Sequence, residues 1–395
     1  MRIPRLAWVI VITVLLSNTQ MTMVTPMIPM FAERFALDQG DVGLFVALNP
    51  LATILLSLPA GVAVSRFGAR RMIVISGSLA VVAAIGLGYS ESGLWFFIAR
   101  FVQGIGGAIM WPAGLAWLTQ TAPPSERGKS LGLGTSASSA GGVVGPVLGA
   151  IALTMSLHLM FGILAGVFSA LALVIGLARV ENEAAIRPTH AKSEGGGLLL
   201  ALRSFGHPDM SIGNILMIVG GVAIGALLTT MPILLAKSGA GPAVLGGTFL
   251  FAAAGNTVFA RIAGGISDKV GVAALIIVGT GAAAILSLAL VLPLSMWPMA
   301  ALVVLLMCAV PVFLIPGVAL LTDAGRERRL DASISYGLSN MTYSLGMAIG
   351  ALTAGWAGQV DAALPGYVAA GLLFLMTATV WIRRRMKTRG ARREE

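Results

Sequence analysis

Charged residues are scarce in this chain, and no acid lies in the middle of an apolar stretch. Of the 395 residues, 11% are charged and 57% are hydrophobic, and the mean hydropathy is +0.92. All 16 Asp and Glu residues fall in polar segments or at the ends of apolar ones. A water-soluble fold would have nowhere to bury this much apolar surface, so the composition predicts a protein of the lipid bilayer.

Cysteine and histidine are also rare. The single cysteine, Cys308, excludes an intramolecular disulfide, and the three histidines lack the spacing of metal ligands. No Gly-x-Ser-x-Gly elbow occurs, and the near match to a dinucleotide fingerprint at 279–284 lies inside an apolar stretch with no strand before it. The sequence therefore predicts no enzyme, no cofactor and no metal site.

Apolar segments long enough to cross a bilayer recur along the chain. A helix needs about 20 apolar residues to cross about 30 Å of hydrocarbon, and the alternating polarity of membrane strands is not evident. The predicted fold class is therefore an all-α membrane protein. Its twelve transmembrane helices are expected over residues 6–30, 42–64, 72–90, 94–118, 130–154, 158–178, 211–236, 243–266, 272–292, 297–321, 333–357 and 366–384.

Basic residues are distributed unevenly between the two sides of the expected membrane. With the N-terminus inside, the inner loops and both termini hold 22 of the 26 Lys and Arg residues, whereas the outer loops hold only Arg34 and Lys237. Positive charge favours the cytoplasmic side, so both termini are predicted to be cytoplasmic, in a bacterial-type inner membrane. The same distribution accounts for the net charge of +10 without nucleic acid.

One long polar segment divides the chain. Residues 179–210 separate two sets of six spans, and both outer tails are short. We therefore expect an N-terminal six-helix bundle (1–178), a cytoplasmic linker (179–210), a C-terminal six-helix bundle (211–385) and a basic cytoplasmic tail (386–395).

A turn rich in glycine and charge occurs once in each half, 203 residues apart, and the same shift carries Pro29 onto Pro232. The chain is therefore predicted to use one module twice. In the first copy, glycines are expected to allow close approach and a tight reversal. The two copies consist of Gly61, Ser65, Arg66 and Gly68, and of Gly264, Asp268, Lys269 and Gly271.

Three segments together resemble the signatures of the major facilitator superfamily over nearly the whole chain. Residues 61–71 (GVAVSRFGARR) are similar to its motif between the second and third helices, and 100–108 (RFVQGIGGA) to its fourth-helix motif. Residues 141–149 (GGVVGPVLG) resemble the fifth-helix motif that the family associates with antiporters, mostly exporters. The resemblance implies two six-helix bundles of inverted triplets around a central site that opens to one side at a time.

The first turn has two interpretations. The charge rule alone explains Arg66, Arg70 and Arg71 as a basic loop at the cytoplasmic surface. The resemblance instead implies a latch, meaning a turn that bonds across to the other bundle when the inner side closes. The family usually carries an Asp at the position of Ser65, so the latch is expected to be weaker in the first copy. Asp331, at the start of the eleventh span, is the candidate partner of Arg66 or Arg70.

The fifth-span motif carries a stripe of small residues. Gly141, Gly145 and Gly149 lie four residues apart, so a neighbouring helix can approach closely, and Pro146 removes one backbone bond and can bend the helix. Packing alone could explain the glycines. The functional interpretation is that the bend seals the outer side of the cavity, which suits export. The eleventh span has glycines at a matching spacing but lacks the proline.

Arg100 is a charged residue within the fourth span, where insertion costs about 2.5 to 3.5 kcal/mol. Helical spacing places Gln103 and Trp111 on its face. One interpretation is a structural arginine bonded to backbone carbonyls. The other, which the resemblance implies, is contact with substrate or participation in proton coupling.

The family's central cavity is lined by the first, fourth, seventh and tenth helices, with contributions from others. Isolated Asn and Tyr residues also bond neighbouring helices, so each candidate has a packing alternative. The candidates that the resemblance implies are Asn18, Thr22, Thr25, Asn214, Met217, Asn256, Phe313, Tyr336, Asn340 and Tyr343.

The missing mid-membrane acid bears on the mechanism. Many proton-coupled relatives depend on a buried carboxylate, so this chain would need another route, such as Asp41 at the outer mouth working with Arg100, or no proton at all. A cavity without a fixed acid suits neutral, amphipathic or weakly anionic compounds.

The predicted function is a monomeric secondary transporter that exports small organic compounds. The alternative is an importer or uniporter of a small anion centred on Arg100. A non-transporting sensor on the same fold is a third reading, which the absence of an output domain disfavours.

Overall fold

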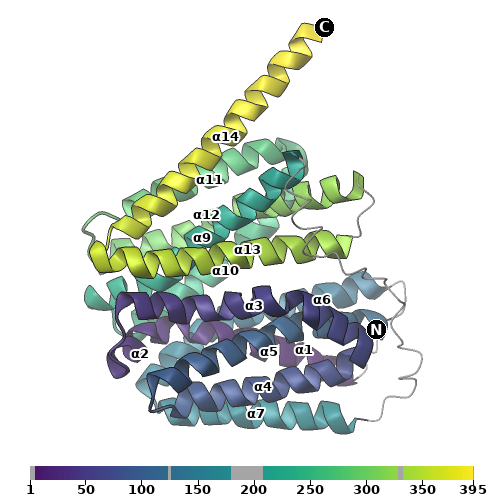
Figure 1. The fold of residues 1–395 in the computed structure, drawn as a ribbon, viewed down its shortest axis with the longest axis vertical. Coiled ribbons are helices and arrows are strands. Elements are labelled where there is room, and N and C mark those ends of the chain that lie inside the picture. Colours follow the sequence, from purple (N-terminus) through teal and green to yellow (C-terminus); the bar gives the residue numbers. More distant parts are fainter. Residues whose placement is uncertain (1–4, 123–125, 179–207, 328–331, 395) are drawn as a thin grey trace. The chain divides into compact units, whose positions relative to one another are not determined.

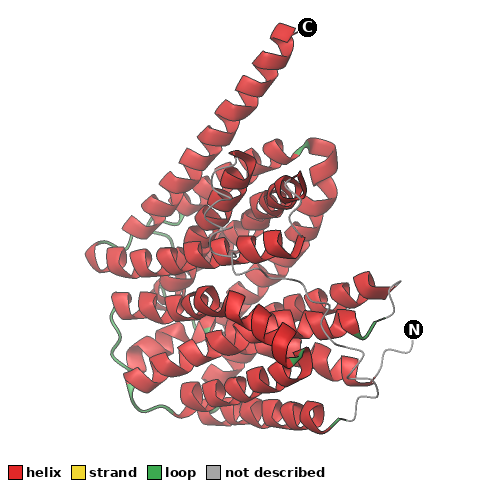
Figure 2. Ribbon diagram, turned by 45° about the vertical axis from the view of Figure 1, so that its right-hand side comes forward, coloured by secondary structure: helices red, strands yellow, loops and turns green. Residues whose placement is uncertain are grey.

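The computed structural model describes residues 5–122, 126–178, 208–327 and 332–394, and the regular elements in these ranges are all helical (Figure 1, Figure 2). The predicted all-α membrane fold is confirmed. The first half contains α1 (Arg5–Met23), η1 (Thr25–Met27), α2 (Ile28–Arg34), α3 (Gln39–Phe67), α4 (Ala69–Tyr89), α5 (Gly93–Gln120), α6 (Arg127–Thr154) and α7 (Leu157–Leu177). The second half contains α9 (Pro208–Lys237), α10 (Pro242–Val270), α11 (Val272–Ala289), α12 (Met296–Glu327), α13 (Ala332–Val360) and α14 (Leu364–Glu394).

The predicted spans each coincide with a described helix. Within the described ranges, eleven helical segments are long and apolar enough to cross a membrane. The remaining predicted span is α13, which has sufficient length but carries more polar side chains, such as Asn340 and Tyr343. At the other end of the chain, α14 continues to Glu394, so the basic segment expected as a separate tail prolongs the last helix.

The first predicted span is broken. Between α1 and α2 the chain forms one turn of 3-10 helix over Thr25–Met27, which contains Pro26. Proline lacks a backbone N–H and therefore interrupts the helical hydrogen bonds. The repeat places Thr229 at the corresponding position of the second half, and α9 is continuous there. The first predicted span therefore contains a 3-10 turn, and Leu6–Arg34 remains one segment long and apolar enough to cross a membrane.

Contacts divide the chain into two compact units. Unit 1 consists of Met1–Ala36, Leu48–Gly195 and Leu245–Leu250, and unit 2 of Leu37–Ala47, Gly196–Val244 and Phe251–Glu395. Two helices contribute their first residues to a different unit from the rest of their length. The start of α3 packs in unit 2, where a Cβ on Gly43 would lie 2.8 Å from Gly355 Cα of α13, and the start of α10 packs in unit 1.

The duplicated turn has the same backbone conformation in both copies. Gly68 and Gly271 both have φ of +87° and directly precede the next helix. Residues that carry a side chain rarely adopt a backbone with this positive φ, so glycine is needed at both positions for the tight reversal. The expected close approach at Gly61 is not seen, because no described atom lies within 4 Å of an added Cβ there.

The glycine stripe of α6 packs directly on α1. A Cβ on Gly145 would lie 2.7 Å from the carbonyl oxygen of Thr19 and 2.9 Å from the backbone nitrogen of Met23. Gly141 and Gly149 meet the backbone of the same helix, at Leu15 and at Met23. Helices can approach this closely only where side chains are missing, because the backbones then touch.

Unit 2 repeats this arrangement between α9 and α13. A Cβ on Gly350 would lie 2.6 Å from Val222 Cα, and Gly346 meets Ile218 in the same way. Here α9 also contributes glycines: a Cβ on Gly221 would lie 2.7 Å from the nitrogen of Met347. Each unit thus contains a helix pair whose backbones meet at a series of glycines.

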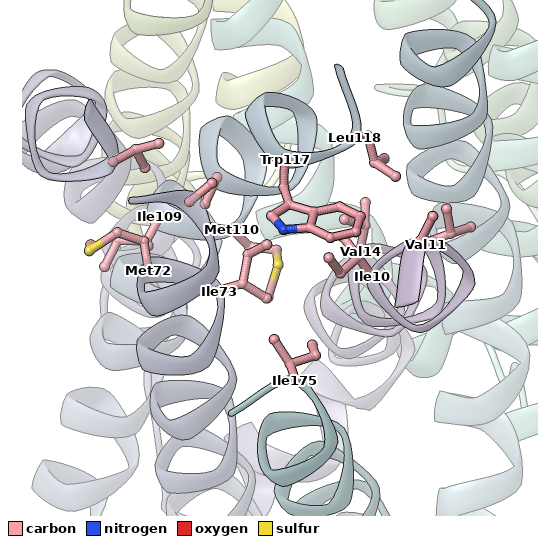
Figure 3. Packing of buried hydrophobic residues seen from close by; sticks show 14 of the residues in the cluster. Ile10, Val11, Val14, Met72, Ile73, Ile109, Met110, Trp117, Leu118 and Ile175 are labelled. Carbon is pink, nitrogen blue, oxygen red and sulfur yellow. The ribbon is translucent and has the colours of Figure 1, made fainter. Parts of the chain in front are cut away.

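A hydrophobic core surrounds one end of the α1–α5 contact in unit 1 (Figure 3). The Trp117 indole lies above Ile10 and Val14 of α1, and is 3% exposed. Met72, Ile73 and Ile175 extend the cluster to α4 and α7 (Figure 3). With Ala60 and Val64 of α3 and Ala137 of α6, the core joins six helices of the unit, and Asn18, Gln20 and Thr22 lie farther along α1.

Candidate substrate site

A polar network crosses the interface of α1 and α5 inside unit 1. Arg100 and Gln103 of α5 are 6% and 5% exposed, and Nη1 of Arg100 donates to Oε1 of Gln103 and to the carbonyl oxygen of Met21, at 3.5 Å for the latter. Gln103 Nε2 then donates to the carbonyl oxygen of Gln20 at 3.0 Å. These acceptors are uncharged, so dipoles in a buried setting solvate the guanidinium.

Gln20 extends the network to a third helix. Its side chain is 1% exposed, and Nε2 donates to the carbonyl oxygen of Ala80 in α4 at 3.0 Å. Gln20 lies near the middle of the Leu6–Arg34 span, so the network sits deep within the bilayer. Gln20 was not among the residues predicted from the sequence, although a glutamine at the centre of an apolar span was a usable signal.

The opposite side of α1 is polar at the same level. Asn18 Nδ2 donates to the carbonyl oxygen of Ser138 at 2.5 Å and to its hydroxyl at 3.1 Å. Thr22 Oγ1 lies 3.0 Å from the carbonyl oxygen of Asn18 and 3.4 Å from that of Gly141. α1 therefore carries polar groups toward α5 on one side and toward α6 on the other.

The Arg100 face of α5 changes from packed to open along the helix. One turn beyond Gln103, a Cβ added to Gly107 would meet no described atom within 4 Å. Another turn on, Trp111 is 39% exposed. The expected polar-to-aromatic face is therefore present, and its aromatic end lies on the surface of unit 1.

Several candidates of the seventh and tenth spans lie inside unit 2. Asn214 and Phe313 are 0% exposed, and Met217 is 3% exposed. The Phe313 side chain packs where Gly279 of α11 and Gly220 of α9 leave room. Phe313 therefore packs as a core residue. This packing does not favour its implied role in lining a cavity.

The other candidates of unit 2 are less enclosed. Asn256 Nδ2 donates to the carbonyl oxygen of Met307 at 3.0 Å and so bonds α10 to α12. On α13, Asn340 is exposed and Tyr343 is partly buried. The Tyr336 side chain lies outside the described part of the structure. Asn256 thus acts as a bond between helices, the packing alternative expected for some of these residues.

Asp41 is held in a helix cap. Its backbone N–H donates to Oδ1 of Asp38 at 2.8 Å, and the Asp38 N–H donates to Oδ2 of Asp41 at 3.2 Å. This reciprocal pair satisfies free donors at the start of α3. Capping of α3 is sufficient to explain why both carboxylates lie here, so no role in proton transfer is needed. Thr25, another candidate, lies in the 3-10 turn that breaks the first span.

The first basic turn bonds within unit 1. Arg70 Nε donates to the carbonyl oxygen of Ile175 at 2.8 Å, and Nη2 donates to those of Gly176, at 2.9 Å, and Ala178. Ser65 Oγ donates to the carbonyl oxygen of Val62, and the Arg66 guanidinium lies 5.7 Å from the Phe67 ring centre. Arg70 therefore caps the last turn of α7.

The structure describes only some of the other residues of the proposed latch. Asp331 and the Asp268 side chain lie outside the described residues, while Lys269 is exposed. Within the described part of the chain, no group of three or more His, Cys, Asp or Glu side chains could hold a metal ion. The site is thus defined by amides, hydroxyls and one guanidinium.

A duplicated set of membrane-spanning helices with a deep polar network is the architecture of a transporter. The sequence profile of the Major Facilitator Superfamily matches residues 10–329. The chain belongs to this superfamily, and the resemblance carried by its three motifs is confirmed.

Curated relatives match the chain in part. Multidrug resistance protein MdtH of Aeromonas hydrophila is 30% identical over 199 residues, which cover 50% of this chain and 50% of that protein. Multidrug resistance protein 1 of Bacillus subtilis is 29% identical over 173 residues, covering 42% of this chain and 44% of that protein. The chain thus spans about half the length of these relatives, or less.

Solved structures match over nearly the whole length. A bacterial homologue of the human lysosomal transporter Spinster, inward-facing and occupied, has a TM-score of 0.76 at 16% identity, covering 96% of both chains. The nucleoside transporter NupG has a TM-score of 0.75 at 14% identity, covering 96% of this chain and 99% of that one. A D-xylose-proton symporter gives 0.74 at 17% identity, covering 95% and 96%. At these identities the likeness shows the shared fold.

Proposed function

We propose that the chain exports small organic compounds by alternating access, with the Arg100–Gln103–Gln20 network as part of its substrate or coupling site. The observation that carries the proposal is the depth of this network. A buried guanidinium in the membrane is costly, and here Arg100 donates to the Gln103 side chain, which donates in turn to the carbonyl oxygen of Gln20 near the centre of the first span. Such placement is typical of residues that act on a solute or an ion.

Two observations support export. The glycine motif of α6, which the family associates with antiporters, packs against α1 beside the network. Relatives at about 30% identity carry the name multidrug resistance protein, although the match covers half of each chain. The proposed substrates are neutral, amphipathic or weakly anionic, because the polar groups where α1 meets α5 and α6 are amides, hydroxyls and the guanidinium of Arg100.

The proposed setting is a bacterial inner membrane, with a monomer whose two termini are cytoplasmic. The distribution of Lys and Arg between loops supports this orientation. A proton is the proposed coupling ion. We do not propose Asp41 as its carrier, because the Asp41 side chain accepts a hydrogen bond in the cap of α3.

The second candidate is an importer or uniporter of a small anion. The observation that favours it is Arg100 itself, a guanidinium that is 6% exposed and whose hydrogen-bond acceptors in the network are uncharged. An anion that reached this level of α5 would find a fixed positive charge.

Inside-out vesicles with an imposed pH gradient test both candidates. Uptake of a lipophilic dye with proton release supports export, whereas anion flux that ignores the gradient supports the second candidate. Arg100→Lys keeps the charge but not the fork of donors, so it should slow transport strongly. Arg261→Gln is the matched control, since Arg261 also lies within a span but is exposed. Equal rates for wild type and both variants would contradict a role for Arg100.

A further inference from the structure

A hollow on the surface of unit 1 lies between α4 and α7, outside the proposed substrate site. These helices lie side by side at the edge of the unit (Figure 1). The hollow measures about 520 Å³, and its lining is apolar apart from two serines. The lining residues are Val74, Ser78 and Val81 of α4, with Ser169, Ala172, Leu173, Gly176 and Leu177 of α7.

Small residues create the hollow. The helices touch where a Cβ on Gly77 would lie 3.4 Å from that of Ala172, and beside this contact Ser78, Ser169 and Gly176 leave the groove unfilled. Each serine hydroxyl donates to a carbonyl four residues earlier in its own helix, so the floor presents little free polarity. Leu173 and Leu177 are 61% and 72% exposed and form an apolar wall.

Two arginines mark one end of the groove. Arg70 donates to the carbonyl oxygens of Ile175 and Gly176 and so ties α4 to the end of α7. Arg71 is exposed, and it makes no hydrogen bond or ion pair with the residues that the structure describes. It precedes Val74 by three residues and Ser78 by seven, which places it on the same face of α4 as the lining. The apolar groove thus begins at a positive charge.

The dimensions match one leaflet of a bilayer. From Arg71 to Val81 is ten residues, or about 15 Å along a helix. This is about half of the 30 Å hydrocarbon core. By the charge distribution of the loops, the arginine end faces the cytoplasm.

We propose that this groove binds one anionic phospholipid, with its phosphate on Arg71 and an acyl chain between Leu173 and Val81. Charge complementarity at the head and apolar walls along the chain select this occupant. The site lies within unit 1 and does not depend on the direction or substrate of transport.

Native mass spectrometry of the purified protein in mixed micelles tests the proposal. The probes are phosphatidylglycerol and phosphatidylcholine with identical acyl chains. Wild type should retain one phosphatidylglycerol in preference to phosphatidylcholine. Arg71→Gln should weaken phosphatidylglycerol retention by about fivefold, the effect of one basic residue near an anionic lipid surface. Arg66→Gln, an exposed arginine of the preceding helix end, is the matched control and should retain the lipid.

Substitutions that fill the groove test the acyl-chain contact separately from the headgroup contact. Ser78→Leu and Ser169→Leu should lower retention of both lipids, whereas Ala170→Leu, at an exposed position outside the lining, should not. Equal retention in the filled and control variants would overturn the proposal, as would a lack of preference between the lipids in wild type. A protein dimer that disappears on filling the groove would also overturn it, because a second copy would then be the occupant.

Discussion

The glycine contact between α1 and α6 is the most direct determinant of how unit 1 packs, and Gly145→Ala tests it. The added methyl would meet the hydroxyl of Thr22 and would lie 2.7 Å from the carbonyl oxygen of Thr19 and 2.9 Å from the nitrogen of Met23. Two of these atoms are backbone, so no rotamer change can relieve the overlap. The helices must separate, and such overpacking costs about 1 to 3 kcal/mol.

Gly132→Ala is the matched control on the same helix. An added Cβ there meets no described atom within 4 Å. Both substitutions gain up to about 1 kcal/mol from the better helix propensity of alanine, so the difference between them isolates the steric cost. Gly132→Ala should therefore be neutral or stabilising, and Gly145→Ala should be less stable than Gly132→Ala by about 1 to 3 kcal/mol.

Thermal unfolding in one detergent, followed by tryptophan fluorescence, measures this difference. A change of 1 kcal/mol shifts the Tm by about 2 to 4 °C in domains of 150–250 residues, so a gap of roughly 2 to 12 °C is expected between the variants. Gly350→Ala should behave like Gly145→Ala, because its added methyl would lie 2.6 Å from Val222 Cα in unit 2. Indistinguishable melting of Gly145→Ala and Gly132→Ala would refute the argument that backbone contact sets the helix spacing.

Three further substitutions test separate parts of the structure. Trp117→Ala empties a core position that is 3% exposed and should cost about 3 to 5 kcal/mol, whereas Trp95→Ala, at 63% exposure, should change the Tm little. Arg70→Gln removes bonds to the end of α7 and should cost about 1 to 3 kcal/mol, with partial rescue by Arg70→Lys in the same melting assay. Asp41→Asn alters the group that accepts from the Asp38 N–H; it should leave the pH profile of vesicle transport unchanged and cost about 1 kcal/mol or less, and a shifted profile would argue against a purely capping role.

The candidate site was only partly predictable. Arg100 and Gln103 were identified because a charge inside an apolar span is expensive and helical spacing puts both on one face. Gln20, which donates to Ala80 of α4, and Ser138, which accepts from Asn18 of α1, were missed. Their partners lie 60 and 120 residues away along the chain, and nothing in local composition indicates which helix faces which.

The break in the first span shows a similar limit. The repeat of Pro29 and Pro232 suggested that the first and seventh spans would match. The structure differs because Pro26 interrupts α1, whereas Thr229 at the matching position keeps α9 continuous. A proline weakens a helix wherever it occurs, but α3, α6 and α12 run through theirs, so the surroundings decide whether the helix ends.

The amino-acid sequence by itself determined that this protein lies in a lipid bilayer, that it is helical and that it contains an internal duplication. These properties follow from local composition and spacing: apolar segments must form helices in lipid, and a turn that needs glycine at Gly68 needs it again at Gly271. Only the tertiary structure decided which backbone carbonyls accept from Arg100 and Gln103, and where α4 and α7 leave a groove. Those features depend on the rotation and separation of packed helices, which arise from many contacts between distant residues.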